Sequence, residues 1–208
     1  MFTSRKDAGG VLAGELIKQG IKADLVLGIV RGGVVVAKEV ADLLHLPLEV
    51  LVVKKLGAPN NSELAIGALT SDGVTFIDNS LVNSLGVEKS YLFNEVKIQH
   101  QAFTVRDKKL RKGYSSISVI NRRVLVVDDG AATGATLFAA IKWLKKKHAG
   151  TIILALPVAA KHAAVELQNL VDRCVILEEP EDFGAVGQFY QDFREVSDDE
   201  VVSLLKPK

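Results

Sequence analysis

One stretch, residues 124–136, constrains the fold of this chain more than any other. It reads VLVVDDGAATGAT. Its first four residues are apolar without alternation, which is typical of a strand covered on both faces in a parallel sheet. Asp128 and Asp129 follow at the carboxyl end of that strand, where open α/β sheets bind ligands. The small residues after them predict a loop that leads into a helix.

Strands and helices alternate along much of the remaining chain. Further strands are predicted at residues 25–30, 48–53, 64–69, 151–158 and 175–177, and helices at residues 8–19, 34–44, 90–112, 136–148 and 161–170. A Ser197 to Glu200 capping box predicts a final helix. We therefore expect one α/β domain over residues 1–208, with a twisted, mostly parallel sheet and helices on both faces.

The chemistry of residues 128–136 suits a sugar phosphate. Two neighbouring carboxylates are pure acceptors, and a ribose offers two adjacent hydroxyl donors. The loop after them has no bulky side chain, so its backbone N–H groups can close on an anion at a helix N-terminus. Thr133 and Thr136 add hydroxyl donors. The alternative is an ordinary connection in which Thr136 caps the helix and the aspartates are solvated.

This stretch resembles the phosphoribosyl pyrophosphate (PRPP) motif of type I phosphoribosyltransferases. The resemblance implies that Asp128 and Asp129 are catalytic, hold the ribose diol and contact Mg²⁺ through water. It also implies that the loop binds the 5′-phosphate. The loop consists of Gly130, Ala131, Ala132, Thr133, Gly134, Ala135 and Thr136.

A second anion loop, GIVRGG, follows the first core strand. A guanidinium, Arg31, stands beside the amides of Gly32 and Gly33, just before a helix. In the family that this chain resembles, the corresponding loop binds pyrophosphate and often contains a non-proline cis peptide, here Val30–Arg31. The alternative is a glycine-rich turn with a solvated arginine.

The third element, residues 54–63, reads KKLGAPNNSE. The family resemblance implies a mobile lid, in which Lys54 or Lys55 meets departing pyrophosphate and Glu63 receives a proton. We take Lys55 as the candidate catalytic lysine. A solvated hairpin explains the same composition. The basic helix end at residues 106–112 is either a solvated C-terminal face or part of the phosphate pocket.

In type I phosphoribosyltransferases, which this chain resembles, chain ends or insertions form a small hood over the acceptor. The resemblance makes residues 1–20 and 180–208 the candidates for that hood. Five apolar residues gather near the C-terminus: Phe183, Val186, Phe189, Tyr190 and Phe193. The alternatives for them are core packing or a dimer contact. We expect a homo-oligomer, with a dimer as the simplest form.

Charge and apolar content indicate the class of partner. The 26 basic and 25 acidic residues give a formal charge of +1, so no global field recruits nucleic acid or membrane. A small-molecule ligand fits better. The N-terminus lacks an apolar signal-peptide core, and no stretch approaches the roughly 18 apolar residues of a membrane span. We expect a cytoplasmic protein.

The combined motifs resemble a broad bacterial group of phosphoribosyltransferases with poorly defined acceptors. The implied function is Mg²⁺-assisted displacement of pyrophosphate at ribose C1′ of PRPP, which makes the protein a glycosyltransferase. Ala132 stands where 6-oxopurine enzymes of the family have an aspartate, which argues against hypoxanthine and guanine. Adenine or a non-purine acceptor stays open. The alternative function is a non-catalytic sensor of PRPP or a nucleotide.

Overall fold

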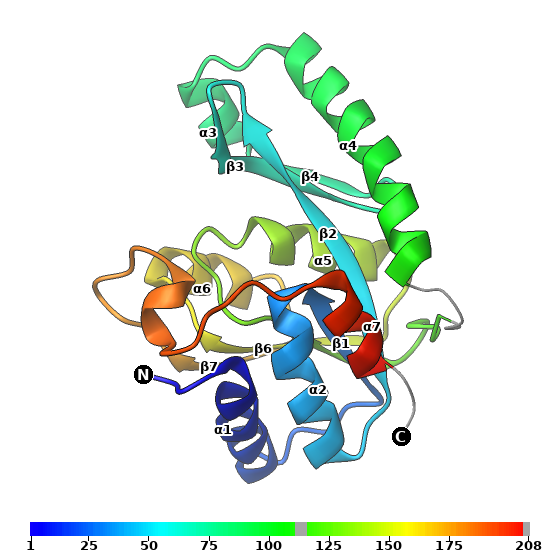
Figure 1. Ribbon diagram of the computed structural model, residues 1–208, viewed down its shortest axis with the longest axis vertical. Coiled ribbons are helices and arrows are strands. Elements are labelled where there is room, and N and C mark those ends of the chain that lie inside the picture. The colour runs from blue at the N-terminus through cyan, green and yellow to red at the C-terminus, as the bar shows by residue number, and fades with distance from the viewer. Residues whose placement is uncertain (111–115, 206–208) are drawn as a thin grey trace.

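A seven-stranded sheet flanked by helices forms the core of the computed structural model, which describes residues 1–110 and 116–205 (Figure 1). The strands are β1 (Leu25–Val30), β2 (Leu48–Ala58), β3 (Asn61–Thr70), β4 (Thr75–Ile77), β5 (Arg123–Val127), β6 (Thr151–Val158) and β7 (Arg173–Glu178). The helices are α1 (Arg5–Lys18), α2 (Gly32–Leu44), α3 (Asn79–Ser84), α4 (Lys89–Leu110), α5 (Ala135–Lys146), α6 (Lys161–Gln168) and α7 (Asp198–Leu205), with a 3₁₀ turn, η1 (Val186–Phe189).

The sheet has the order β4-β3-β2-β1-β5-β6-β7. Strands β2, β1, β5, β6 and β7 run parallel to one another, whereas β3 and β4 add an antiparallel edge. The prediction of a mostly parallel sheet is confirmed. Because β1 and β5 are adjacent and parallel, the loops that follow them open at the same edge of the sheet.

Strand β5 shows why an apolar run without alternation belongs inside a parallel sheet. Val124 and Val126 pack with α5 and α6, whereas Leu125 and Val127 pack with α1 and α2 on the opposite face. All four side chains are fully buried. Helices therefore cover both faces, as predicted.

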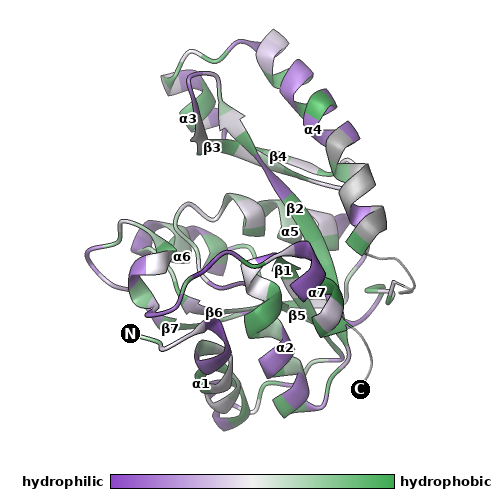
Figure 2. Cartoon of the chain, in the orientation of Figure 1, coloured by the Kyte–Doolittle hydropathy of each residue, from purple (hydrophilic) through white to green (hydrophobic). Residues whose placement is uncertain are grey.

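The prediction of an irregular loop over residues 54–63 is wrong. Strand β2 continues to Ala58 and pairs with β3 in a hairpin, in which Lys55 lies opposite Ala68. The strand continues because Leu56 is fully buried in a cluster with Ile66 and residues of α4. Residues 54–63 thus form a hairpin, as in the alternative, and its role as a mobile lid stays a prediction. Figure 2 shows β2 hydrophobic in the core and hydrophilic where it leaves the core.

The segment between the hairpin and β5 contains more structure than its sequence pattern predicts. Strand β4 and the short helix α3 were not predicted; Asp78 caps α3 by accepting a hydrogen bond from the Leu81 amide at 2.9 Å. Helix α4 ends at Leu110 among the described residues, and the side chains of Arg106, Lys108 and Lys109 lie outside them. In Figure 1 these elements stand together at one end of the molecule, beyond α5.

The two ends of the chain meet beside the sheet. Phe2 forms a parallel bridge with Tyr190: its amide donates to the Phe189 carbonyl at 2.8 Å, and its carbonyl accepts from the Gln191 amide at 2.8 Å. Phe2, Tyr190 and Phe193 share one apolar cluster. The structure thus joins the segments predicted to form a hood, and whether they cover an acceptor stays a prediction. Helix α7 begins with the predicted capping box, since Ser197 and Glu200 exchange hydrogen bonds.

No helix within residues 1–110 and 116–205 is both long enough and apolar enough to cross a bilayer.

Candidate active site

A cavity of about 520 Å³ opens at the carboxyl ends of β1 and β5. It brings together the carboxylate pair, the loop after it, Arg31, Gly32 and Lys55. The full lining is Ile29, Val30, Arg31, Gly32, Lys55, Asp128, Asp129, Gly130, Ala131, Ala132, Thr133, Gly134, Ala135, Thr136, Gly184, Ala185, Val186, Gly187 and Phe193. Every predicted site residue except Gly33 belongs to this lining.

Gly33 lies directly behind the carboxylate pair. A Cβ at this position would stand 2.4 Å from Oδ1 of Asp128, so glycine is needed for the close approach. The Val30–Arg31 peptide bond that precedes this turn is cis, as predicted.

The two carboxylates are held by different partners. Oδ1 of Asp128 accepts a hydrogen bond from the Asp129 amide at 2.9 Å. Oδ2 of Asp129 accepts from Nε of Arg5 at 2.7 Å, an ion pair whose side chains are only 10% and 15% exposed. The protein thus holds one oxygen of each carboxylate, and a diol in the cavity would meet the other.

Burial dominates the electrostatics of this pair. It raises the pKa of Asp128 well above the usual value, and the neighbouring charge of Asp129 raises that pKa further. Burial also raises the pKa of Asp129, while the Arg5 guanidinium opposes the rise. The Lys55 ammonium lowers both pKa values, so its charge reaches the carboxylates from β2.

The Gly130–Thr136 loop is joined by hydrogen bonds to the end of β6. The Ala131 amide donates to the Val158 carbonyl at 3.0 Å, and the Ala131 carbonyl accepts from the Ala160 amide at 2.8 Å. The Ala131 amide is therefore already engaged, and an anion would be met by amides later in the loop. Gly134, with φ +74°, turns the chain into α5, whose N-terminus lines the cavity.

The remaining predicted groups divide between the cavity and other places. Arg31 reaches the cavity and forms an ion pair with Glu195 from the segment before α7. Lys55 lines the cavity, but Lys54 is not part of the lining. The side chain of Glu63 lies outside the described residues, so its role as a proton acceptor stays a prediction.

Sequence reasoning missed three residues that hold the site. Arg5 binds Asp129, Glu195 binds Arg31, and the Tyr190 hydroxyl donates to the Asp129 carbonyl at 2.6 Å. Burial raises the pKa of Tyr190, with the Asp129 charge adding to the rise, so this hydroxyl stays a donor. Arg5 and Tyr190 belong to the two chain ends predicted to form a hood, but no local pattern connects them to the aspartates.

Tyr190→Phe tests the hydrogen bond to the backbone of Asp129. Tyr190 is only 5% exposed, so the substitution leaves the partly buried Asp129 carbonyl without this donor. We expect the free energy of unfolding to fall by about 1–3 kcal/mol in urea titrations. Tyr91→Phe is the matched control, because Tyr91 donates to the Gly57 carbonyl at 3.0 Å from a more exposed position. A loss no greater than that of the control would contradict the assignment.

The protein side chains at the cavity could bind magnesium only together with oxygen atoms from a bound ligand and water. Among the described residues, no group of three or more His, Cys, Asp or Glu side chains could hold a metal ion. Asp128 and Asp129 supply two carboxylates beside the cavity. Mg²⁺ is commonly bound by one or two carboxylates together with substrate phosphates and water, and this pair suits that arrangement.

Comparison with known proteins identifies the family of this chain. A family model described as a phosphoribosyl transferase domain matches residues 3–194. Two strains of Mycobacterium tuberculosis encode a relative whose provisional name is phosphoribosyl transferase, 40% identical over 205 residues. The match covers 99% of this chain and 46% of the relative, so the chain spans about half the length of these curated relatives.

Two solved structures have the same architecture. The TT1426 protein from Thermus thermophilus is 38% identical, has a TM-score of 0.82, and aligns over 99% of this chain and 97% of its own. The AQ2163 protein from Aquifex aeolicus is 12% identical with a TM-score of 0.50 over 83% of this chain and 73% of its own, and shares the fold alone. With the family model matching nearly the whole chain, this protein belongs to the phosphoribosyl transferase family.

Proposed function

We propose that the protein transfers the phosphoribosyl group of PRPP to a small-molecule acceptor. One observation carries the proposal. The carboxylate pair, the Gly130–Thr136 loop and the Arg31 loop all line a single cavity. A diol, a 5′-phosphate and a pyrophosphate on one sugar require those three kinds of group side by side.

The proposed reaction is a displacement at C1′. The bond between C1′ and the pyrophosphate oxygen breaks as the bond from C1′ to the acceptor forms, and the sugar ring gains positive charge in between. Arg31 and the amides beside it stabilise the negative charge that develops on the departing pyrophosphate. Lys55 lines the same cavity. Bound Mg²⁺ would neutralise part of that charge. Asp128 and Asp129 orient the diol, so that positioning supplies much of the catalysis.

The acceptor would lie against the C-terminal segment. Gly184 to Gly187 and Phe193 line the same cavity as the phosphate loop, and Val186 adds an apolar surface beside Gly130. These residues belong to the proposed hood, which would limit access of water to the reacting sugar. Ala132 gives the acceptor no polar side chain, so an adenine-like or non-purine acceptor remains the better candidate.

Pyrophosphate release tests the proposal. The purified protein, Mg²⁺ and PRPP are incubated with a panel of nucleobases and other nitrogen acceptors, and released pyrophosphate is compared with a no-acceptor control. We expect release that depends on one acceptor class. Tight PRPP binding without release for any acceptor would instead indicate the sensor function. Absence of PRPP binding would refute both.

Glu195→Gln tests the role of Arg31. Glu195 contacts the guanidinium that we assign to pyrophosphate, so the two anions compete for it. Because the Glu195 side chain is largely exposed, the competition is weak, and the variant should bind Mg²⁺-pyrophosphate up to about fivefold more tightly in calorimetry. Glu181→Gln is the matched control: it removes another exposed ion pair, with Lys161, outside the cavity. Weaker binding by the Glu195 variant would argue against this assignment of Arg31.

A further inference from the structure

Arg5 is a charged residue of α1 that lies outside the sequence motifs of the site but contacts one of their carboxylates. It is the first residue of that helix, directly after the Ser4 cap, and only 9% of its surface is exposed. A buried arginine needs partners for its charge and its donors. The structure supplies three partners, all of them far away in the sequence.

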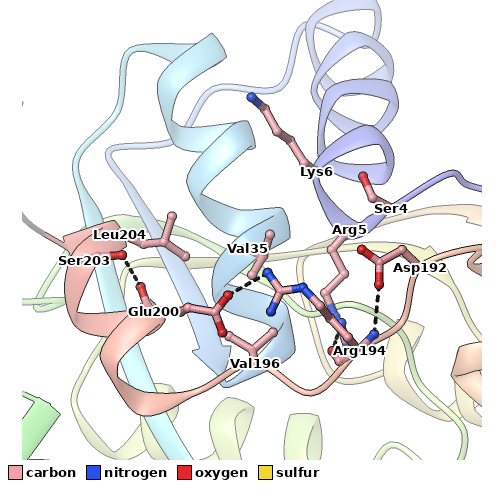
Figure 3. A pocket seen from close by; sticks show the side chains of 10 residues that line it. All are labelled: Ser4, Arg5, Lys6, Val35, Asp192, Arg194, Val196, Glu200, Ser203 and Leu204. Carbon is pink, nitrogen blue, oxygen red and sulfur yellow. Dashed lines mark hydrogen bonds and ion pairs between the residues drawn. The ribbon is translucent and has the colours of Figure 1, made fainter.

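The head group of Arg5 is held on several sides. Nε donates to Oδ2 of Asp129 at 2.7 Å, and Nη1 donates to the Arg194 carbonyl at 2.9 Å. Its Cζ lies 3.8 Å from the ring centroid of Phe193. Figure 3 shows the side chain running from α1 to the backbone at Arg194, in the wall of a cavity of about 270 Å³. The guanidinium is therefore buried and fixed by several contacts, unlike that of a solvated surface ion pair.

The contact sets the orientation of one carboxylate of the PRPP site. A guanidinium is planar and presents its donors in a fixed geometry, so its bond to Oδ2 restricts how the Asp129 carboxylate can turn. The pair also packs directly against the pyrophosphate loop. A Cβ on Gly32 would lie 2.0 Å from Oδ2 of Asp129 and 2.8 Å from Nε of Arg5. The carboxylate therefore has little room for another orientation.

The positive charge of Arg5 also favours binding of PRPP, because it offsets the negative charge of the carboxylate pair. Asp128 and Asp129 are adjacent and largely buried, and both would repel a ligand that carries several negative charges. Arg5 places a positive charge against Asp129 without entering the cavity lining itself. The site can then use a carboxylate as a hydrogen-bond acceptor for a sugar while its repulsion of the phosphates is reduced.

We propose that Arg5 is a positioning residue for the ribose, which acts by holding the Asp129 carboxylate in the orientation that accepts the sugar hydroxyls. The inference rests on the proposed function. Arg5 also contacts Arg194 and Phe193, so α1 and the C-terminal segment both contribute to the PRPP site in this proposal. Removal of Arg5 should weaken the binding of ligands that carry the ribose. It should not change the binding of pyrophosphate, which we assign to the Arg31 loop.

Calorimetry with two Mg²⁺ complexes, PRPP and pyrophosphate, tests the inference in the full chain. Arg5→Met should weaken PRPP binding at least about tenfold, while pyrophosphate affinity changes less than about twofold. Arg5→Lys should give an intermediate loss for PRPP, because lysine restores the charge but not the two-point contact. Lys6→Met, on the neighbouring exposed residue, is the matched control and should change neither affinity. Thermal unfolding of each variant shows whether it is folded, and Arg5→Lys carries the test if Arg5→Met is not.

A double-mutant cycle separates positioning from a general structural effect. If Arg5 acts through Asp129, Arg5→Met should add less than about threefold to the loss already caused by Asp129→Asn. Equal losses for both ligands, an unchanged PRPP affinity, or additive losses in the cycle would overturn the inference and leave the proposed function standing. A wild-type protein that binds pyrophosphate but not PRPP would overturn the proposed function, and the inference with it.

Discussion

Asp129→Ala should abolish measurable PRPP binding in the presence of Mg²⁺. The substitution removes a charged acceptor for the ribose diol and leaves the Arg5 guanidinium buried without its carboxylate partner. The lost hydrogen bond to a charged acceptor contributes about 1.5–3 kcal/mol, and the unpaired Arg5 guanidinium beside the cavity adds to the loss, so we expect the affinity to fall at least about 100-fold. Calorimetry with Mg²⁺-PRPP measures the change directly.

Two further variants define the cause of that loss. Asp129→Asn keeps the shape of the side chain, so it distinguishes the missing charge from a cavity or a local rearrangement. Asp24→Ala removes a carboxylate that also pairs with an arginine, Arg123, but at an exposed position outside the cavity, and PRPP binding should be unchanged. Near-wild-type affinity of Asp129→Ala would refute the assignment of the carboxylate pair to the ribose.

Gly32→Ala should weaken PRPP binding about 10- to 100-fold without removing any functional group. The new methyl group would lie 2.0 Å from Oδ2 of Asp129, so the carboxylate must leave its place beside Arg5. Because Arg5 is itself held by Arg194 and Phe193, the pair cannot simply shift as a unit. The same calorimetric titration, together with thermal unfolding, measures this effect.

Gly14→Ala is the matched control for that substitution. Gly14 lies inside α1, and a Cβ there meets no atom within 4 Å. Alanine should leave PRPP affinity unchanged and stabilise the helix by roughly 0.5–1 kcal/mol. If Gly32→Ala binds PRPP within about twofold of the wild type, the Asp129 carboxylate is not confined as the structure indicates.

The structure changes how the hairpin contributes to the site. The sequence predicted a loop over residues 54–63, whereas Lys55 lies on strand β2, in which the next residue, Leu56, is buried. A residue on a strand has a defined direction, so Lys55 reaches the cavity and Lys54 is not part of its lining. Composition rich in turn formers could not distinguish these cases, because a hairpin needs the same residues at its tip.

The structure also distinguishes between the alternatives that the sequence left open for the ends of the chain. Aromatic residues near the C-terminus were compatible with a hood, core packing or a dimer contact. Tyr190 shows that core packing is part of the answer, since it is buried against Phe2 and Phe193. Gly184 to Gly187 line the cavity, which supports the proposed hood. The homo-oligomer and the cytoplasmic location stay predictions.

A few consecutive residues are enough to predict the strands of this protein and the turns that follow them, because these features depend on local sequence. Four apolar residues without alternation, a pair of aspartates and a loop of small residues predict a doubly covered strand with an anion-binding turn at its end. The same holds for β1 and the glycine turn after it. Local periodicity and steric freedom control such features, and both can be read from a few consecutive residues.

The side chains that hold the carboxylates could be identified only in the folded chain. Arg5 and Asp129 are 124 residues apart, and Tyr190 and Asp129 are 61 apart. Sequence patterns show which face of a helix or strand is buried, but not which element packs against that face. The partners of Asp129 depend on the meeting of α1, β5 and the C-terminal segment, and that meeting is a property of the tertiary fold.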